Sequence, residues 1–265
     1  MTDDLQPAAE DQVVRERRGK VEVVRINRER ARNAIDGPTT KALQQTFDEL
    51  TTDDDAWAVV LTGTGARAFC AGMDLKAFAT GEVADILSAK GGFGGLTRRH
   101  FPKPLIAAVN GAALAGGCEL VLACDLVVAA EHATFGIPEV KRGLVAAGGG
   151  LLRLHRRIPY AVALELALTG DTVDAARAYE LGLVNHVVPA EQVVEEAVSL
   201  AEKICANAPL AVRTSKEIMR LALELDEEQS WAMNTDHVGP IFASKDALEG
   251  AIAFAEKRPP NWQGA

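Results

Sequence analysis

The chain contains 265 residues, of which 48% are hydrophobic and 25% are charged, and its formal net charge at pH 7 is −9. This length accommodates one large α/β domain or a domain with a helical extension, and the composition is that of an ordinary soluble protein. The acidic balance argues against nucleic acid or an anionic membrane as the main partner.

The amino-terminal segment and the cysteines indicate a cytoplasmic protein without a metal. Residues 1–12 are acidic and polar, lack the apolar region of a signal peptide, and are predicted to form a disordered tail. The four cysteines show neither a C-x-x-C pair nor a histidine at ligand spacing, which argues against zinc. A reducing cytoplasm therefore fits the sequence best, and no metal site is expected.

The first part of the chain alternates predicted strands and helices. Residues 21–26 and 57–62 are predicted strands, and residues 39–50 have the apolar spacing of an amphipathic helix. Residues 63–68 then match the dinucleotide-binding pattern G-x-G-x-x-A after a strand. No helical periodicity follows the second glycine, so a Rossmann-type nucleotide site is not favoured.

A glycine-rich segment occupies residues 81–96, where Gly91, Gly92, Gly94 and Gly95 surround Phe93. Glycine at this density is typical of a mobile segment. We expect it to form a lid near a ligand.

The stretch 105–125 organises the rest of the chain. It begins as an apolar strand, breaks at Asn110, and continues as a helix-forming run behind Gly116 and Gly117, with Glu119 inside it. Free backbone N–H groups at such a helix start, beside an acid, suit the stabilisation of an oxyanion and a proton transfer. Two alternatives are a transmembrane span, which the glycines and polar residues oppose, and a buried helix whose glutamate merely pairs with a cation.

Beyond this stretch, strands and helices alternate until about residue 190, and only helices follow. Predicted strands cover residues 126–130, 134–136 and 184–188, and predicted helices cover residues 151–154, 161–168, 174–181, 191–206, 210–225, 227–237 and 244–257. We therefore predict an α/β core over residues 13–189, which contains the site, and a helical carboxy-terminal region over residues 190–265. The apolar side of that region exceeds what one small core can cover, which predicts oligomerisation through it.

Four motifs occur together in this sequence. They are residues 68–76 (AFCAGMDLK), 110–119 (NGAALAGGCE), 135–139 (FGIPE) and 254–258 (FAEKR). In this order and spacing the chain resembles the crotonase (enoyl-CoA hydratase/isomerase) superfamily, from about Val21 to the carboxy terminus. Each motif alone is modest, and their joint occurrence is specific.

The resemblance implies an α/β fold built as a spiral of ββα units with a carboxy-terminal helical trimerisation region. It implies a homotrimer or a dimer of trimers, an acyl-CoA thioester as substrate, and neither a metal nor a redox cofactor. The thioester oxygen is then expected between the backbone N–H groups of Met73 and Gly116. The CoA-binding residues implied are Ala71, Met73, Asp74, Leu75 and Lys76, together with Lys257, which in this family often serves a neighbouring subunit's site.

The two acids distinguish the reaction within the superfamily. Hydratases resemble this chain in carrying two glutamates, here Glu119 and Glu139, and the resemblance implies that Glu119 activates water and Glu139 delivers the α-proton. Ala147 stands where many hydratases have a glycine whose N–H helps to hold the water. The expected function is therefore reversible hydration of a 2-enoyl-CoA to a 3-hydroxyacyl-CoA. The alternatives are another crotonase reaction (isomerisation, decarboxylation or thioester hydrolysis) or a non-catalytic acyl-CoA-binding protein.

Overall fold

The computed structural model describes residues 11–79, 81, 86 and 90–265, and its strands form two sheets. The six-stranded sheet has the order β1 (Val13–Arg18), β2 (Val21–Ile26), β3 (Ala58–Gly63), β5 (Leu105–Val109), β7 (Leu126–Ala130) and β10 (His186–Val188). The four-stranded sheet has the order β4 (Ala68–Cys70), β6 (Ala112–Leu114), β8 (Thr134–Gly136) and β9 (Thr172–Asp174). Neighbouring strands are parallel except at β1–β2 and β8–β9. This is the predicted α/β class.

A repeated unit links the two sheets. The chain passes from β3 to β4, from β5 to β6 and from β7 to β8, and each time it leaves the larger sheet for the smaller one. A helix follows each pair: α2 (Leu75–Ala79), α4 (Gly116–Ala123) and the 3-10 helix η3 (Pro138–Arg142). The predicted succession of ββα units is therefore confirmed, and each of the three helices begins beyond the carboxyl end of one of the parallel strands β4, β6 and β8.

The turn between β5 and β6 shows why its two residues are Asn and Gly. The Asn110 side chain donates to the carbonyl of Gly63 (2.9 Å) and to that of Gly65 (2.5 Å), which ties the turn to its equivalent after β3. A Cβ on Gly111 would lie 2.5 Å from the carbonyl carbon of Arg67. Only glycine permits this approach of two backbones.

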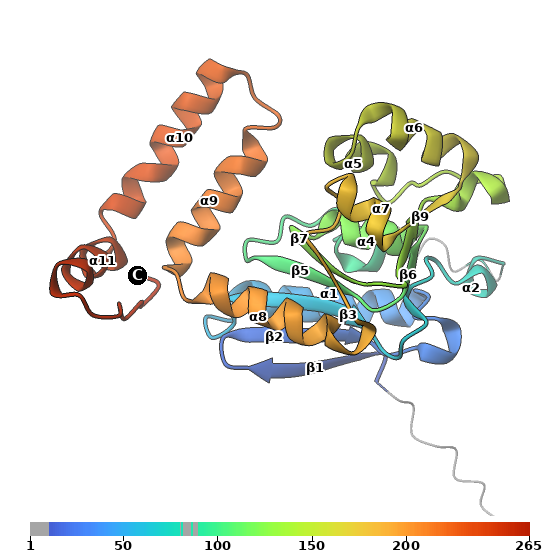
Figure 1. Ribbon diagram of the computed structural model, residues 1–265, viewed down its shortest axis with the longest axis horizontal. Helices are drawn as coiled ribbons and strands as arrows, with labels where there is room; N and C mark the ends of the chain where they lie inside the picture. The colour runs from blue at the N-terminus through green and yellow to red at the C-terminus, as the bar shows by residue number, and fades with distance from the viewer. Residues whose placement is uncertain (1–10, 80, 82–85, 87–89) are drawn as a thin grey trace, which may run out of the picture.

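Helices cover the sheets and extend beyond them. The other helices are α1 (Gly37–Thr52), the 3-10 helices η1 (Glu29–Ala31), η2 (Phe93–Gly95) and η4 (Ala190–Gln192), α5 (Gly150–Arg157), α6 (Tyr160–Thr169), α7 (Ala175–Glu180), α8 (Val193–Cys205), α9 (Pro209–Leu221), α10 (Glu227–Phe242) and α11 (Lys245–Glu256). Helix α8 packs on the larger sheet, whereas α9, α10 and α11 project away from it (Figure 1). No helix within the described residues is both long and apolar enough to cross a membrane.

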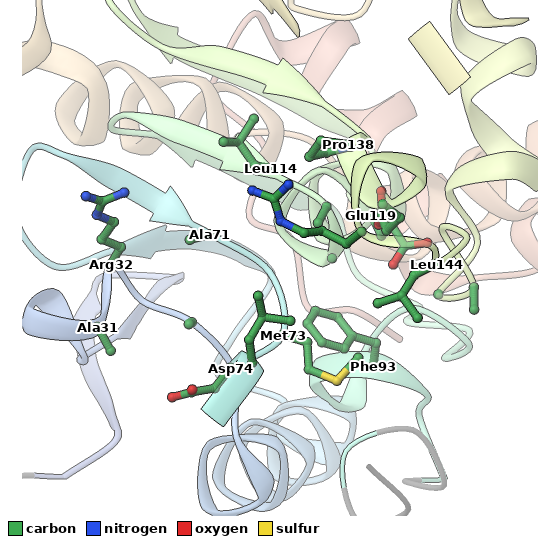
Figure 2. A pocket seen from close by; sticks show the side chains of 18 of the residues that line it. Ala31, Arg32, Ala71, Met73, Asp74, Phe93, Leu114, Glu119, Pro138 and Leu144 are labelled. Atoms are coloured by element: carbon green, nitrogen blue, oxygen red, sulfur yellow. The ribbon is translucent and has the colours of Figure 1, made fainter. Parts of the chain in front are cut away.

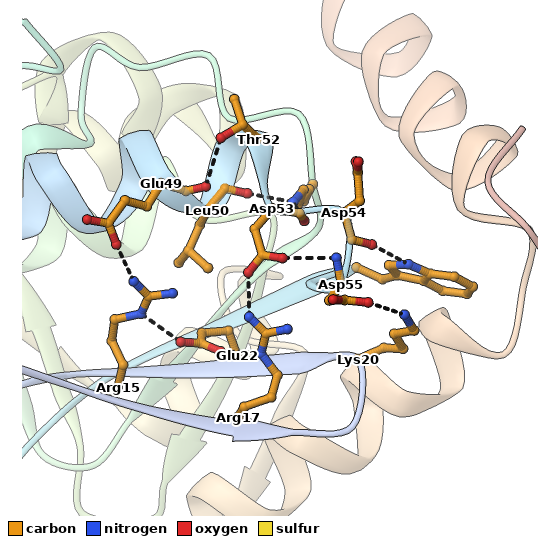
Figure 3. A network of polar contacts seen from close by, with 12 residues as sticks. Arg15, Arg17, Lys20, Glu22, Glu49, Leu50, Thr52, Asp53, Asp54 and Asp55 are labelled. Carbon is orange, nitrogen blue, oxygen red and sulfur yellow. Dashed lines mark hydrogen bonds and ion pairs between the residues drawn. The ribbon is translucent and has the colours of Figure 1, made fainter.

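A polar network fastens the edge of the larger sheet to the end of α1 (Figure 3). The buried carboxylate of Glu22 pairs with Arg15 at 2.7 Å and with Arg17 at 2.5 Å. Arg17 also reaches Asp53 at 2.5 Å, just beyond α1, and Arg15 reaches Glu49 at 2.6 Å. Strand β1, which the sequence analysis did not predict, is held by these charged groups more than by apolar burial.

Two expectations need correction. The tail was predicted to include residue 12, but the Gln12 carbonyl accepts a hydrogen bond from Asn27 N–H (2.9 Å); residues 1–10 lie outside the described residues. The lid prediction is wrong for Gly91–Gly95, which are buried. Gly92, Gly94 and Gly95 have positive φ, and a Cβ on Gly95 would lie 2.6 Å from the Gln44 Cα. These glycines serve tight packing against α1; residues 82–85 and 87–89 of the predicted segment lie outside the described residues.

Candidate active site

A cavity of about 990 Å³ opens beside the start of α4 (Figure 2). Its lining comes from four segments that the ββα units bring together, at residues 28–34, 71–76, 114–119 and 138–148, and from Phe93. Apolar atoms form most of the wall, and the charged residues of the lining include Glu119 and Glu139. Such a cavity is the usual setting for a small-molecule site.

Met73 and Gly116, whose backbone amides are predicted to bind the thioester oxygen, both line this cavity. Ile35 N–H donates to Gly72 O and Asp74 N–H donates to Ile35 O (both 2.8 Å), which leaves the Met73 amide on the opposite side of its strand. Gly116 begins α4, so its N–H lacks an intrahelical acceptor. No backbone carbonyl of the described residues accepts either N–H group, and both are available for a ligand oxygen.

Close packing fixes these two amides relative to each other. A Cβ on Gly72 would lie 3.2 Å from the Gly116 nitrogen, so the Met73 segment and the start of α4 are in contact. Ala115, the residue before Gly116, has φ 52° and ψ −127°, a conformation that side chains disfavour. Its N–H donates to Gly136 O (2.9 Å), and the Phe93 ring packs against Gly116 on the other side.

Glu119 lies in the first turn of α4, buried at the inner end of the cavity. Gly150 N–H donates to its Oε1 at 2.9 Å. Burial raises the pKa of Glu119 above its ordinary value, while the backbone amides of Gly150 and Gly148 and the charge of Arg153 oppose that rise. The alternative of a structural ion pair is not favoured, because the carboxylate is held chiefly by amides and faces a cavity.

Glu139 lies on η3 and lines the same cavity. Burial raises its pKa to about 7, and the negative charge of Glu119 acts in the same direction. Its Oε2 is buried and has no hydrogen-bond partner among the described residues. A carboxyl group in this environment is protonated for a substantial part of the time at neutral pH, so it can donate a proton.

The loop Gly148–Gly150 has a role that the sequence analysis missed. A Cβ on Gly148 would lie 2.4 Å from Glu119 Oε2, and one on Gly150 would lie 3.2 Å from Oε1. Glycine at both positions lets the backbone wrap around the carboxylate. The sequence does show three consecutive glycines before the predicted helix at residues 151–154, but no neighbouring residue relates them to Glu119.

The outer part of the cavity carries the predicted CoA-binding residues Ala71, Met73, Asp74, Leu75 and Lys76, all of which line it. Ala147, the predicted water-holding residue, also lines the cavity and is exposed. Lys257 caps the end of α11 in a left-handed conformation and is not among the lining residues of its own chain.

Arginines at the mouth were not predicted. Arg28 pairs with Asp36 at 2.7 Å and with Asp74 at 3.2 Å, which joins the 28–34 segment to the Met73 segment. Arg30 and Arg32 line the same mouth and are exposed. The run of three arginines in five residues is visible in the sequence, but only the fold brings it opposite Asp74.

A two-sheet ββα spiral whose pocket joins two free amides to two carboxylates defines a crotonase-type protein. The family model described as enoyl-CoA hydratase/isomerase matches residues 16–265. The chain therefore belongs to the enoyl-CoA hydratase/isomerase family, as the motifs predicted.

Relatives support this placement along nearly the whole chain. Carnitinyl-CoA dehydratase from Proteus mirabilis is 42% identical over 252 residues, which cover 93% of this chain and 96% of the relative. The solved structure of an enoyl-CoA hydratase from Mycobacterium tuberculosis is 51% identical, with a TM-score of 0.92 and coverage of 97% and 100% of the two chains. That of a carnitinyl-CoA hydratase from Mycobacterium avium is 46% identical, with a TM-score of 0.77 and the same coverage.

Proposed function

We propose that this protein is an acyl-CoA hydratase that reversibly adds water to a 2-enoyl-CoA to give the 3-hydroxyacyl-CoA. The observation that carries the proposal is the pair of glutamates, the buried Glu119 and the half-buried Glu139, which line one cavity with Met73 and Gly116, whose amides have no backbone acceptor among the described residues. Hydration requires a base, an acid and an oxyanion site, and this cavity holds groups suited to each role.

The oxyanion site acts first. The thioester carbonyl oxygen accepts hydrogen bonds from Met73 N–H and Gly116 N–H, which polarise the conjugated double bond. As water adds at the β-carbon, negative charge moves onto this oxygen. One such donor is typically worth about 3–4 kcal/mol in the transition state.

The two carboxyl groups move the protons. Ionised Glu119 takes a proton from water while the water oxygen forms a bond to the β-carbon, and the double-bond electrons move toward the thioester. Protonated Glu139 then gives its proton to the α-carbon, which completes the 3-hydroxyacyl-CoA. The Ala147 amide is suited to hold the attacking water beside Glu119. Proton exchange through water restores the two carboxyl groups for the next turnover.

Coenzyme A enters as part of the substrate, and we propose neither a metal nor a redox cofactor. The cations Arg30, Arg32 and Lys76 at the mouth have the charge needed for the CoA phosphates, beside the apolar Ala71 and Leu75. Lys257 would supply a further cation to a neighbouring subunit in a homotrimer or a dimer of trimers. The four free cysteines agree with a cytoplasmic location.

A second candidate is dehydration of carnitinyl-CoA, because several relatives about 42% identical carry the name carnitinyl-CoA dehydratase. Dehydration is the reverse of the proposed step and would use the same groups. The two reactions differ only in the acyl group that the inner cavity accepts.

A panel assay tests the proposal. Purified protein is mixed with enoyl-CoA thioesters of increasing chain length and with the dehydrated form of carnitinyl-CoA, and loss of the enoyl absorbance is followed. Rapid loss with at least one thioester, with the 3-hydroxyacyl-CoA identified by mass spectrometry, is the expected result. Tight binding of the thioesters without turnover would indicate a non-catalytic binding protein, and a product of unchanged mass would indicate an isomerase.

A further inference from the structure

Arg153, in the first turn of α5, lies outside the lining of the cavity, and its positive charge acts on the Glu119 carboxylate. Its Nη2 donates to the carbonyl of Thr97 at 2.7 Å. Its Nη1 is buried and has no hydrogen-bond partner among the described residues. A Cβ on Gly149 would lie 2.4 Å from that Nη1, so the guanidinium packs directly against the backbone of the loop.

Arg153 contacts two segments, and each of them packs against a group of the proposed reaction site. Gly149 lies between Gly148 and Gly150, the two glycines whose backbone wraps the Glu119 carboxylate. Thr97 directly follows the glycine-rich segment, in which the Phe93 ring packs against Gly116. The Arg153 guanidinium therefore contacts both the loop that holds the Glu119 carboxylate and the segment that packs against Gly116.

We propose that Arg153 is a positioning residue for the reaction, which ties the Gly148–Gly150 loop to the Thr97 segment and supplies a positive charge that acts on the Glu119 carboxylate. This inference rests on the hydratase function proposed above. Arg153 touches neither the cavity nor any reacting atom, so it acts through Glu119 and through the two segments.

The charges around Glu119 make this role specific. The charged groups that interact with it are Arg153 from α5 and Glu139 from η3. The other elements packed on α4 are β4, β6 and η2, and their one titratable side chain is Cys70. Burial raises the pKa of Cys70 and that of Cys118, next to Glu119, to about 12, so both thiols are uncharged at neutral pH.

Arg153 acts unequally on the two acids. Its charge lowers the pKa of Glu119, whereas burial and the Glu119 charge raise that of Glu139. The arginine thereby favours ionised Glu119 beside protonated Glu139, the distribution that hydration requires. Without Arg153, only the backbone amides of Gly150 and Gly148 would oppose the effect of burial on the pKa of Glu119.

The test compares Arg153→Met and Arg153→Lys with Arg156→Met, which removes an exposed arginine from the same helix. Three quantities are measured: the pH profile of kcat/KM on the best enoyl-CoA, KM at neutral pH, and hydrogen–deuterium exchange of residues 90–99. Arg153→Met is expected to lower kcat about 10–100-fold, as misplacement of a catalytic group does. The acidic limb of its profile should move to higher pH, because a nearby cation favours the carboxylate.

KM should change by less than about threefold, because Arg153 lies outside the substrate cavity. Exchange of residues 90–99 should accelerate in Arg153→Met. Arg153→Lys should keep the acidic limb near its original position and recover part of kcat. Arg156→Met should match the unaltered protein in every measurement.

Two results would overturn the inference. The first is a folded Arg153→Met protein with an unchanged acidic limb, whatever its kcat, since the arginine would then serve only the scaffold. The second is unchanged exchange of residues 90–99, since the two segments would then not be coupled. If the unaltered protein hydrates none of the thioesters, the proposed function fails by itself, and the exchange comparison still decides whether Arg153 couples the segments.

Discussion

The two parts of this molecule differ in how many of their apolar side chains they bury. In the ββα core, large side chains such as Phe47, Phe69 and Phe135 are fully buried. On the carboxy-terminal helices, Met219 is 74% exposed, Phe242 is 80% exposed and Phe254 is 86% exposed. The core completes its own interior and contains the proposed chemistry, whereas α9–α11 present surface that a second copy could cover. Reaction and assembly should therefore respond to different substitutions.

The largest effect on turnover is expected from the two acids in the core. Glu119→Gln and Glu139→Gln should each lower hydration by roughly 10³-fold or more, because each amide keeps the shape and loses the proton transfer. The double variant should be little slower than the slower single variant, since the two groups act as a unit. Steady-state kinetics, acyl-CoA affinity and light scattering are measured together. Near-normal turnover in either single variant would make that glutamate structural, and altered assembly would weaken the separation of the two parts.

Substitutions of Ala147 test a single backbone N–H group within the core. Ala147→Pro deletes the backbone N–H, and loss of one donor to a reacting oxygen costs roughly 10²–10³-fold in rate. Ala147→Gly keeps the N–H and should stay within about fivefold of the original rate. Circular dichroism and acyl-CoA affinity must first show that the proline variant is folded. A folded, ligand-binding proline variant with normal hydration would mean that the water is held elsewhere.

The pH dependence of the hydration rate should show the titration of both carboxyl groups. The rate should fall as pH rises through about 7, because Glu139, whose pKa is raised to about 7, then loses the proton that it donates. It should also fall at low pH, where Glu119 becomes protonated and can no longer accept a proton. Each limb is expected to change kcat/KM by about tenfold per pH unit. Both limbs report the coupled pair of acids and not a single residue. A rate that stays constant above neutral pH would contradict the role of Glu139 as the acid.

The smallest effect on turnover is expected from the carboxy-terminal helices. The unaltered protein should be a trimer or hexamer by light scattering at micromolar concentration. Phe242→Asp or Phe254→Asp should shift it toward smaller species, because a charge replaces surface that a partner would cover. Val14→Asp, at an exposed site on β1, is the control and should leave assembly unchanged.

The same variants test Lys257. If Lys257 serves a neighbouring subunit, loss of assembly and Lys257→Ala should raise KM to a similar extent, by about two- to tenfold, with kcat nearly unchanged. A monomeric unaltered protein would refute the assembly proposal and remove the cross-subunit role.

The sequence located the main groups of the site because each belongs to a local motif. Glu119 and Gly116 share one helix start, and Met73 follows the Cys70 strand, so short-range patterns were enough. The fold class followed in the same way, from alternating strands and helices. The assignments of roles to these residues remain proposals.

What escaped the sequence analysis depends on long-range contacts. Arg153 and Gly148 act on Glu119 across about 30 residues of chain, and Arg28 meets Asp74 across 46 residues. Strand β1 is charged and mostly exposed, so its sequence lacks the alternation of apolar and polar residues that predicts a strand. Gly91–Gly95 were misinterpreted because composition cannot distinguish glycines required for close packing from glycines that confer mobility.

Ala115 has a consequence for the relation between folding and ligand binding. A non-glycine residue held at φ 52° and ψ −127° costs of the order of 1–3 kcal/mol, and the fold must supply this free energy. The Gly116 amide is consequently oriented before any thioester arrives. Binding energy from the CoA moiety is not consumed in turning that peptide, so it remains available for aligning the double bond with water. The strain at Ala115 lowers the stability of the folded protein, and it also reduces the reorganisation that the Gly116 peptide needs during the reaction.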